Sequence, residues 1–385
     1  MRPRVSQPKH LRPPRPSCYA GALALKGQVM QPCAEAEREG VCVCLYGGGF
    51  RTGWCGWCVE LLCGCCELGL FFIDFGVPRY FFSNVFGMAY HDGRASITQL
   101  NTVRKHLSAI KGGQLGAAAH PARLVALILS DVVGDEVDVI ASGPTVPDPS
   151  TYADALAALD ALAVAGIPPR VLHRLQAGAR GDEDVQETPK CGDSRLAGCL
   201  THVLGNNRLA AHEALQLLRR EGYQGHVDTV SLEGDVEEAA ARVARLASAL
   251  LAPSSALATK TCVILAGETT VKFGQGGLGS GKGGRCSHMA LLVARHLRGL
   301  DNWCLVSAGT DGQDGPCDSA GAFADGHTWL RGRNAGSEPE EAVAKFDSYT
   351  FFDKEGGLIR TGLTGTNVMD LHLLLCHPAE AKSTT

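Results

Sequence analysis

The sequence has little net charge, few aromatic residues and no long apolar run. Its 385 residues include 36 Lys and Arg against 40 Asp and Glu, and 6% are Phe, Trp or Tyr. A dedicated nucleic-acid-binding protein normally has a basic excess, so we expect no nucleic-acid partner. No stretch reaches the roughly 18–20 uncharged apolar residues of a bilayer span, so we expect no membrane partner. A secretory signal is not expected either, because prolines rather than an apolar segment follow the basic start.

What the sequence does contain is typical of an α/β protein. Apolar residues make up 45% of the chain, enough to form a sizeable core, and the length allows two or three domains. The 47 glycines fall in clusters between apolar runs, as in proteins with tight loops between strands and helices.

Cysteine use divides the chain. Nine of the 16 cysteines lie before residue 67, and the other seven are scattered singly. Scattered cysteines predict a protein from a reducing compartment, and we expect the cytoplasm. A mitochondrial location is the alternative, because residues 1–16 are basic and free of acidic residues, as transit peptides are. Five prolines in that stretch oppose the amphipathic helix that such peptides form.

The Cys-rich N-terminal segment, residues 1–97, shows neither a helical period nor a strand alternation. We expect it to be atypical and poorly ordered. It contains Cys55-x-x-Cys58 followed by Cys63, Cys65 and Cys66. Tetrahedral thiolates suit zinc, so a zinc-binding module is one hypothesis, although the spacings fit no common zinc fold well.

From residue 98 onward, strand and helix patterns alternate. The patterns predict helices over 99–111, 150–165, 207–221 and 236–251, and strands over 124–130, 200–204 and 227–231. This alternation implies a parallel sheet with helices on both faces. A linker over 252–258 divides a first unit, 98–252, from a second unit, 259–378. In the second unit we expect strands over 261–266, 270–273, 303–307 and 368–375, and helices over 286–297 and 338–344.

A glycine-rich loop, Gly274 to Gly284, joins a strand to a helix. Unpaired backbone N–H groups at a helix start favour phosphate or carboxylate. The loop nearly matches a Walker A motif, but Gly283 stands where Ser or Thr would bind magnesium, so we reject that reading. Arg285 at the helix start could bind an anion through two parallel hydrogen bonds. A flexible surface loop is the alternative.

Two acidic loops follow predicted strands. Asp311, Asp314 and Asp318 come after one strand, and Asp131 follows another. Sheets of this class bind ligands at the carboxyl ends of their strands, and carboxylates could hold magnesium or act as a base. Asp-Gly turns and helix caps are the alternative reading of both loops.

A predicted helix carries a run of cations, Arg104, Lys105 and Lys111. Three cations on one helix suit an anionic substrate. A solvated helix face is the usual explanation of such a run.

Taken together and in this order, these blocks resemble the glycerate kinase family, whose C-terminal unit is the MOFRL domain. The resemblance covers about residues 98–376. The matching stretches are Asn101–Gly113, Leu129–Asp135, Asp138–Thr145, Gly267–Val271, Gly283–Arg285, Gly309–Gly315, Asp347–Tyr349 and Thr364–Asn367.

The resemblance implies a two-domain α/β fold in which a Rossmann-like MOFRL-associated domain, incomplete here, precedes an α/β MOFRL domain. It implies transfer of the γ-phosphoryl group of ATP to a hydroxyl of D-glycerate, with Mg²⁺ as cofactor, and it allows a homodimer. The expected catalytic residues are Arg285, Asp311 and Asp314. The residues expected to bind substrate or phosphate are Arg104, Lys105, Lys111, Gly283, Gly284 and Thr310. Those expected to bind the nucleotide are Gly276, Gly277, Gly279, Lys282 and Asp131, and the expected metal ligands are Asp311 and Asp318.

Two departures from the family pattern give a second hypothesis. The family arginine is usually followed by Asn-Gln-Glu, whereas Cys286, Ser287 and His288 follow Arg285 here. Residues 1–97 do not resemble the family's first segment and contain no counterpart of the lysine regarded there as catalytic. The alternative is therefore a catalytically impaired member that binds at most a nucleotide or a partner.

Overall fold

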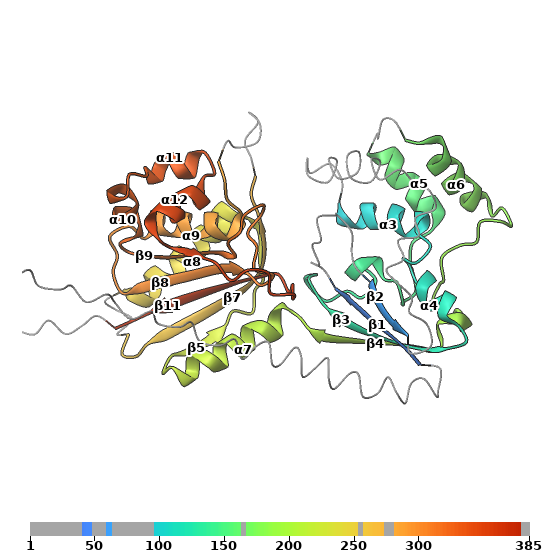
Figure 1. The fold of residues 1–385 in the computed structure, drawn as a ribbon, viewed down its shortest axis with the longest axis horizontal. Helices are drawn as coiled ribbons and strands as arrows, with labels where there is room; N and C mark the ends of the chain where they lie inside the picture. The colour runs from blue at the N-terminus through green and yellow to red at the C-terminus, as the bar shows by residue number, and fades with distance from the viewer. Residues whose placement is uncertain are drawn as a thin grey trace, which may run out of the picture.

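The computed structural model describes the backbone of residues 41–47 and 59–63, and residues 96–162, 167–252, 257–272 and 281–378 in full. Two lobes lie side by side, each built around its own sheet (Figure 1). We call residues 96–205 with the first two strands the first lobe, and residues 206–378 the second lobe. None of the described helices is long and apolar enough to cross a membrane.

The first lobe contains a four-stranded sheet in the order β2-β1-β3-β4. Its strands are β1 (Val41–Gly47), β2 (Val59–Cys63), β3 (Arg123–Leu129) and β4 (Cys199–Gly205). The central strand β3 is parallel to both β1 and β4, whereas β2 is antiparallel to β1. The predicted strands over 124–130 and 200–204 and their parallel pairing are confirmed. Strands β1 and β2 lie in the segment where the sequence predicted no element.

The helices of the first lobe are α3 (Ile97–Leu107), α4 (Gln114–Ala119), α5 (Tyr152–Ala161) and α6 (Pro169–Arg180). Helix α3 begins with a capping box in which Ser96 and Gln99 bond each other's backbone N–H, which satisfies two donors at the helix start. It ends four residues earlier than predicted, because Ser108 is already extended. Helix α6 was not predicted; its apolar face, with Val171 and Leu175, packs with α3 and α5.

The second lobe contains a seven-stranded sheet in the order β10-β9-β8-β11-β7-β5, with β6 also paired to β7. The strands are β5 (Gln224–Val227), β6 (Leu232–Asp235), β7 (Thr261–Thr270), β8 (Trp303–Gly309), β9 (Gly321–Asp325), β10 (Leu358–Ile359) and β11 (Asp370–Cys376). The helices are α7 (Asn207–Arg220), α8 (Val236–Leu251), α9 (Arg285–His296), α10 (Thr328–Asn334), α11 (Pro339–Ala344) and α12 (Ser348–Glu355).

The division between the two sheets differs from the predicted boundary at 252–258. Strands β5 and β6 both pair in parallel with β7, so α7, β5, β6 and α8 belong to the second lobe. The single strand expected over 227–231 is wrong: β5 ends at Val227 and β6 starts at Leu232. The sheet is also mixed, because β11 runs antiparallel to both β7 and β8.

The larger apolar cluster of the second lobe lies between the sheet and helices α8 and α9. Residues Met289–Ala294 of α9 are almost wholly buried, and they pack with Val263 and Leu265 of β7. Alternate residues of β7, Cys262 and Ile264, face the other side and pack against α7. Strand alternation thus places α7 on one face of the sheet and α8 with α9 on the other.

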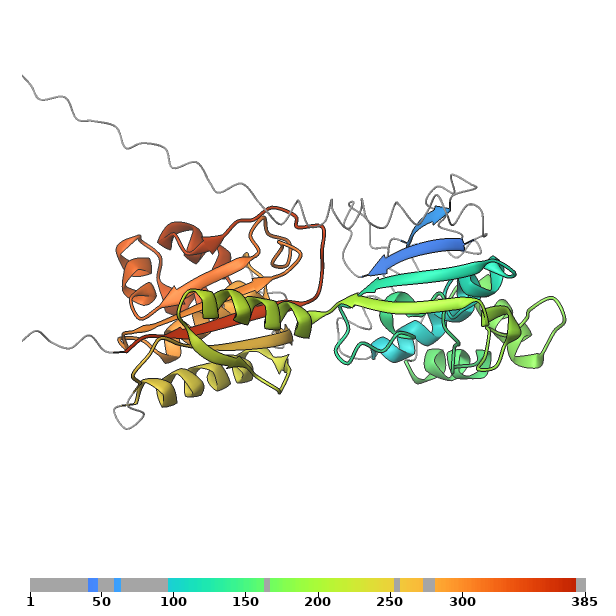
Figure 2. The ribbon, with the colours of Figure 1, turned by 90° about the horizontal axis from the view of Figure 1, so that it is seen from below.

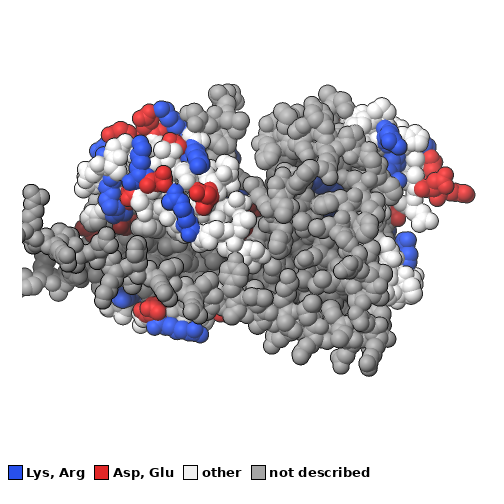
Figure 3. Space-filling view, viewed as in Figure 1, with Lys and Arg blue, Asp and Glu red and all other residues white. Residues whose placement is uncertain are grey.

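Charges are mixed on the surface of the second lobe. Over the described residues of the face in Figure 3, Lys and Arg side chains are interspersed with Asp and Glu around α10, α11 and α12. Ion pairs such as Arg331 with Asp325 and Lys345 with Glu341 account for part of this mixing.

Candidate active site

The passage from β4 to α7 brings the two lobes together at one place (Figure 2). The backbone N–H of Ser130, just after β3, donates to Gly205 at the end of β4. The Asn206 side chain caps α7 and donates to Asp135 at 2.6 Å. The Asn207 amide donates to the carbonyls of Val368 and Asp370. The carboxyl end of β3 therefore lies near the start of β11.

Arg285, the first residue of α9, is held by two carboxylates at this place. Its Nε and Nη2 donate to the two carboxylate oxygens of Asp370, at 2.5 and 3.0 Å. Its Nη1 lies 2.7 Å from Oε1 of Glu268 on β7. Burial acts to lower the pKa of Arg285, but these carboxylates outweigh burial and raise it. The guanidinium is therefore a fixed positive charge.

Further carboxylates lie near Glu268. Burial raises the pKa of Glu268; Asp370 and Asp311 raise it further, and Arg285 opposes them. Asp131, from the end of β3, is close enough for Glu268 to contribute to its raised pKa of about 6, of which burial is the main cause. Its Oδ1 atom is buried without a hydrogen-bond partner. Two carboxylates thus hold the guanidinium of Arg285, and Asp311 and Asp131 are close enough to Glu268 to raise its pKa or to be affected by it.

The expected residues Thr310 and Asp311 follow β8. The Thr310 hydroxyl donates to the Met369 carbonyl at 2.7 Å and accepts from the Val368 N–H at 2.8 Å. Thr310 therefore holds the segment before β11 in place. These are contacts within the protein, whereas we expected Thr310 to bind substrate or phosphate. Oδ1 of Asp311 accepts only from the Gln313 N–H among the described residues, at 2.9 Å.

Asp314 caps helix α9. Its two carboxylate oxygens accept from the backbone N–H groups of Cys286 and Ser287, both at 2.8 Å. Burial raises the pKa of Asp314 although these hydrogen bonds oppose it. A Cβ atom on Gly284 would lie 2.2 Å from Oδ1 of Asp314, so only glycine fits there. The contacts of this expected catalytic residue are those of a group that positions Arg285.

Asp318 has partners of its own. It accepts from the Tyr349 hydroxyl at 2.6 Å and lies 3.8 Å from Nε of Arg360. The hydrogen bond from Tyr349 is the main cause of its lowered pKa. Among the described residues, Asp318 and Asp311, the two expected metal ligands, belong to no group of three His, Cys, Asp or Glu side chains that could hold a metal ion.

The expected glycine contacts are described only in part. Gly276, Gly277 and Gly279 lie outside the described residues. At Gly283 a Cβ atom would meet the Ser348 hydroxyl at 2.3 Å, so this glycine allows the chain to pass close to the start of α12. Lys282, just before it, has its ammonium group over the ring of Tyr349.

The three expected cations of α3 and the loop after it contact the protein itself. Nζ of Lys105 is 3.2 Å from Asp148 and 3.6 Å from Asp138, and the Lys105 side chain is almost wholly buried. Lys111 donates to the Ala141 carbonyl at 3.0 Å, and Arg104 donates to Asn101 at 3.3 Å.

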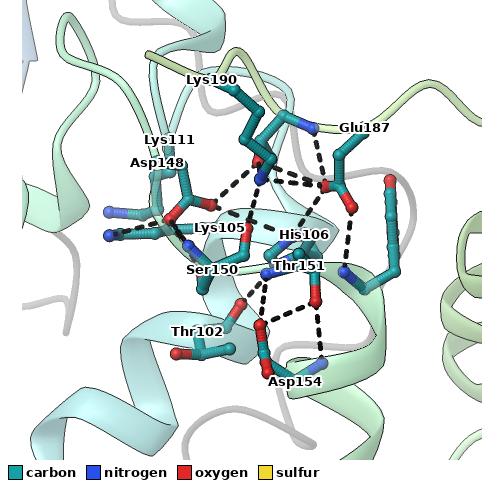
Figure 4. A network of polar contacts seen from close by, with 12 residues as sticks. Thr102, Lys105, His106, Lys111, Asp148, Ser150, Thr151, Asp154, Glu187 and Lys190 are labelled. Atoms are coloured by element: carbon teal, nitrogen blue, oxygen red, sulfur yellow. Dashed lines mark hydrogen bonds and ion pairs between the residues drawn. The ribbon is translucent and has the colours of Figure 1, made fainter.

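Lys105 belongs to a polar network within the first lobe that the sequence did not predict. Figure 4 shows His106 between Asp148 and Glu187, with Lys190 beside Glu187. The network joins α3 to the start of α5 and to the segment at 187–190, which lie far apart in the sequence.

Sequence reasoning missed Glu268, Asp370 and Asn207 as residues of the site. Asp370 is the first residue of β11, which runs antiparallel to its neighbours, so a rule about the carboxyl ends of parallel strands does not point to it. Glu268 lies inside β7, within a block that the family resemblance included, and that block was the available signal.

Comparison with known proteins identifies two regions of the chain, and the second of them contains Arg285. Residues 90–176 match a family described as a domain of unknown function, DUF4147, and residues 261–370 match the MOFRL family.

Individual relatives agree with these matches. A D-glycerate 2-kinase of Thermotoga maritima is 40% identical over 282 residues, which are 72% of this chain and 62% of that protein. A glycerate kinase of Macaca fascicularis is 37% identical over 327 residues, 74% of this chain and 80% of that protein.

A crystal structure of a Thermotoga maritima glycerate kinase has a TM-score of 0.66 and 38% identity, and covers 78% of this chain and 68% of that one. The match thus spans about three fifths of the Thermotoga curated relative and four fifths of the macaque one. On this similarity, the chain belongs to the glycerate kinase family.

Proposed function

We propose that this chain transfers the γ-phosphoryl group of ATP to a hydroxyl of D-glycerate, giving phosphoglycerate. The observation that carries the proposal is the guanidinium of Arg285, which Asp370 and Glu268 hold at the start of α9. The names of the relatives supply the substrate class.

Arg285 has donors left for a substrate. A guanidinium has five N–H donors, and Asp370 and Glu268 use three of them. The remaining two can donate to oxygens of the transferred phosphoryl group or of the glycerate carboxylate. Phosphoryl transfer depends mostly on positioning and on stabilising charge, which a fixed guanidinium provides without rearrangement.

Asp131 is suited to accept the proton of the attacking hydroxyl. A pKa of about 6 keeps it ionised at neutral pH while making it a better base than an ordinary aspartate. Its Oδ1 atom is buried and has no hydrogen-bond partner among the described residues, so its lone pairs are not taken by the protein. We therefore expect Asp131→Asn to lower kcat more than it changes KM for ATP.

The carboxylates of the site fit Mg²⁺ in part. Among the described residues no three His, Cys, Asp or Glu side chains are arranged to hold a metal ion by themselves. Mg²⁺ usually takes one or two carboxylates together with water and phosphate oxygens, and Asp311 would fill that part. When bound with ATP, the ion would neutralise charge on the phosphates. Asp318 is less suited, since Tyr349 and Arg360 contact its oxygens.

The test is phosphoglycerate formation by the purified chain with Mg-ATP and D-glycerate. We expect turnover in the wild type and a loss of about 100-fold or more in Arg285→Ala, which also excludes a contaminating kinase. Product analysis tells the 2-phosphate from the 3-phosphate, and the name of the Thermotoga relative favours the 2-phosphate. Absence of turnover in both, with Mg-ATP still bound, would support the alternative of a catalytically impaired member.

The family resemblance allows a homodimer, and sedimentation velocity of the purified chain tests for one.

The compartment is a separate expectation. A reducing compartment, the cytoplasm or else the mitochondrion, is supported by the free thiols of all seven described cysteines, and cell fractionation tests it.

A further inference from the structure

The residues between α11 and α12 and the first turn of α12, Lys345 to Tyr349, contact the residues just before α9. The Gly281 N–H donates to the Lys345 carbonyl at 3.0 Å. The Lys282 N–H donates to Oδ1 of Asp347 at 2.8 Å, and the Tyr349 N–H donates to the Lys282 carbonyl at 2.8 Å. The backbone N–H and the backbone carbonyl of Lys282 are therefore both hydrogen-bonded to this segment.

The side chain of Lys282 is held by the same segment. Its Nζ atom lies 3.8 Å from the centre of the Tyr349 ring, a close cation–π contact. No ion pair of Lys282 occurs within the described residues, and its side chain is exposed. It differs in this from Lys105, whose charge is buried against Asp148.

The Tyr349 ring is itself fixed. Its hydroxyl donates to Asp318 at 2.6 Å and accepts from Nη2 of Arg360 at 3.1 Å. The same Arg360 nitrogen donates to Asp353 at 2.6 Å. The ring thus presents one face to Lys282 in a set orientation.

This arrangement adjoins the proposed active site. Lys282 precedes Arg285 by three residues, and the Ser287 and Ser348 hydroxyls, 2.9 Å apart, connect α9 to α12 at the same place. An ammonium group has three N–H donors. With the ring on one side, its outward donors can meet the oxygens of an anion bound next to Arg285.

We propose that Tyr349 is a positioning residue that orders the ammonium group of Lys282 for the phosphate groups of the nucleotide. The inference rests on the proposed function. A free lysine side chain has many rotamers, and ordering it before the ligand arrives reduces the cost of binding. Tyr349 acts through Lys282 and does not itself touch the ligand.

A double-mutant cycle on binding tests this. The affinities of Mg-ATP, inorganic tripolyphosphate and D-glycerate are measured by calorimetry for the wild type, Lys282→Met, Tyr349→Leu and the double variant. We expect Lys282→Met to weaken Mg-ATP and tripolyphosphate by about tenfold, the effect of one charge-assisted contact. Tyr349→Leu should weaken both by about fivefold, and the double variant should bind no more weakly than Lys282→Met.

Tyr349→Phe is the matched control. It keeps the ring face but removes the hydroxyl contacts with Asp318 and Arg360, so we expect a loss of about twofold, smaller than that of Tyr349→Leu. If Tyr349→Leu does not fold, Tyr349→Met replaces it, since methionine fills similar space without a ring face. Thermal unfolding of each variant establishes that it is folded.

Three results would overturn the inference. Additive effects of the two substitutions would mean that Tyr349 acts independently of Lys282. An effect of Tyr349→Phe as large as that of Tyr349→Leu would assign the role to the hydroxyl. A change in D-glycerate affinity with none in tripolyphosphate affinity would assign Lys282 to the carboxylate. If the wild type binds tripolyphosphate but not Mg-ATP, the proposed function fails while this cycle still decides the role of Tyr349.

Discussion

The two lobes differ in the kinds of side chain that they bury. Among the described residues, the first lobe has two small apolar clusters and buries Lys105, His106 and Asp148. The second lobe has a large apolar cluster around α9 and a smaller one against α7, and its buried acidic residues, Asp314 and Asp370, lie at the site. A buried charge network stabilises a fold only when every member has its partner, whereas apolar packing depends on volume. The first lobe should therefore be sensitive to the loss of single charges, and the second to the loss of apolar volume.

The largest effect is expected from a cavity in the second lobe. Phe351 is fully buried, and its ring packs edge-to-face on Phe352 with centres 5.1 Å apart. We expect Phe351→Ala to destabilise the second lobe by roughly 3–5 kcal/mol, through lost transfer energy and the cavity left behind. Hydrogen exchange read by mass spectrometry resolves the two lobes. Leu330→Ala is the control, because Leu330 is exposed and its loss should cost less than about 0.5 kcal/mol. Equal opening of the first lobe would show that the lobes unfold as one unit.

A somewhat smaller effect is expected from Lys105→Met in the first lobe. The substitution leaves Asp148 buried without its cation, although Ser150 and Thr188 still donate to it. We expect a loss of about 3 kcal/mol, confined to the first lobe. The matched control is Lys111→Met, in which a partly exposed lysine loses one contact to a carbonyl. Unchanged exchange in α3 of the Lys105 variant would contradict the idea that this lobe depends on its charges.

Lowering the pH should destabilise the first lobe before the second, and this effect should be smaller than that of either substitution. Burial acts to raise the pKa of Asp148 and Glu187, but Lys105 and Ser150 in one case, and the N–H groups of Thr188 and Tyr152 in the other, outweigh it and lower both. Their stabilisation is present above the ordinary values of 3.8 and 4.5 and is lost as the pH falls through the lowered ones.

The second lobe has the opposite sign at Glu268 and Glu355. Burial raises both pKa values above 4.5, so their contribution is present below 4.5 and is lost as the pH rises through the raised values. On acidification we expect amide exchange to increase first in α3 and α5. Exchange that increases first around β7 would reverse the comparison.

The sequence was informative where a signal is local. The helices starting at Asn207 and Val236 and the strand ending at Leu129 were predicted within one or two residues, because apolar periodicity and caps such as Asn206 are short-range features. The residue types of the site, Arg285 and the aspartates after β3 and β8, were also found from their places at element ends.

Which residues contact one another was predicted less well. Asp314 reads in the sequence as one of three equivalent aspartates, yet it alone caps α9. Lys105 reads as a surface cation of a helix, yet it is buried against Asp148, 43 residues away. Neither distinction can be read from spacing, because it depends on which segments fold against one another.

The α/β class and most of the elements could be predicted from the sequence alone, since they follow from local periodicity, glycine placement and helix start signals. The family resemblance pointed to Arg285, but not to Glu268 and Asp370, which hold it. Only the tertiary structure decided that β5 and β6 join β7, that Asp370 rather than Asp314 holds Arg285, and that Tyr349 rather than a carboxylate holds Lys282. The reason is that pairing and burial arise between residues distant in the chain, where the energy of a contact depends on the surrounding fold and not on the neighbouring sequence.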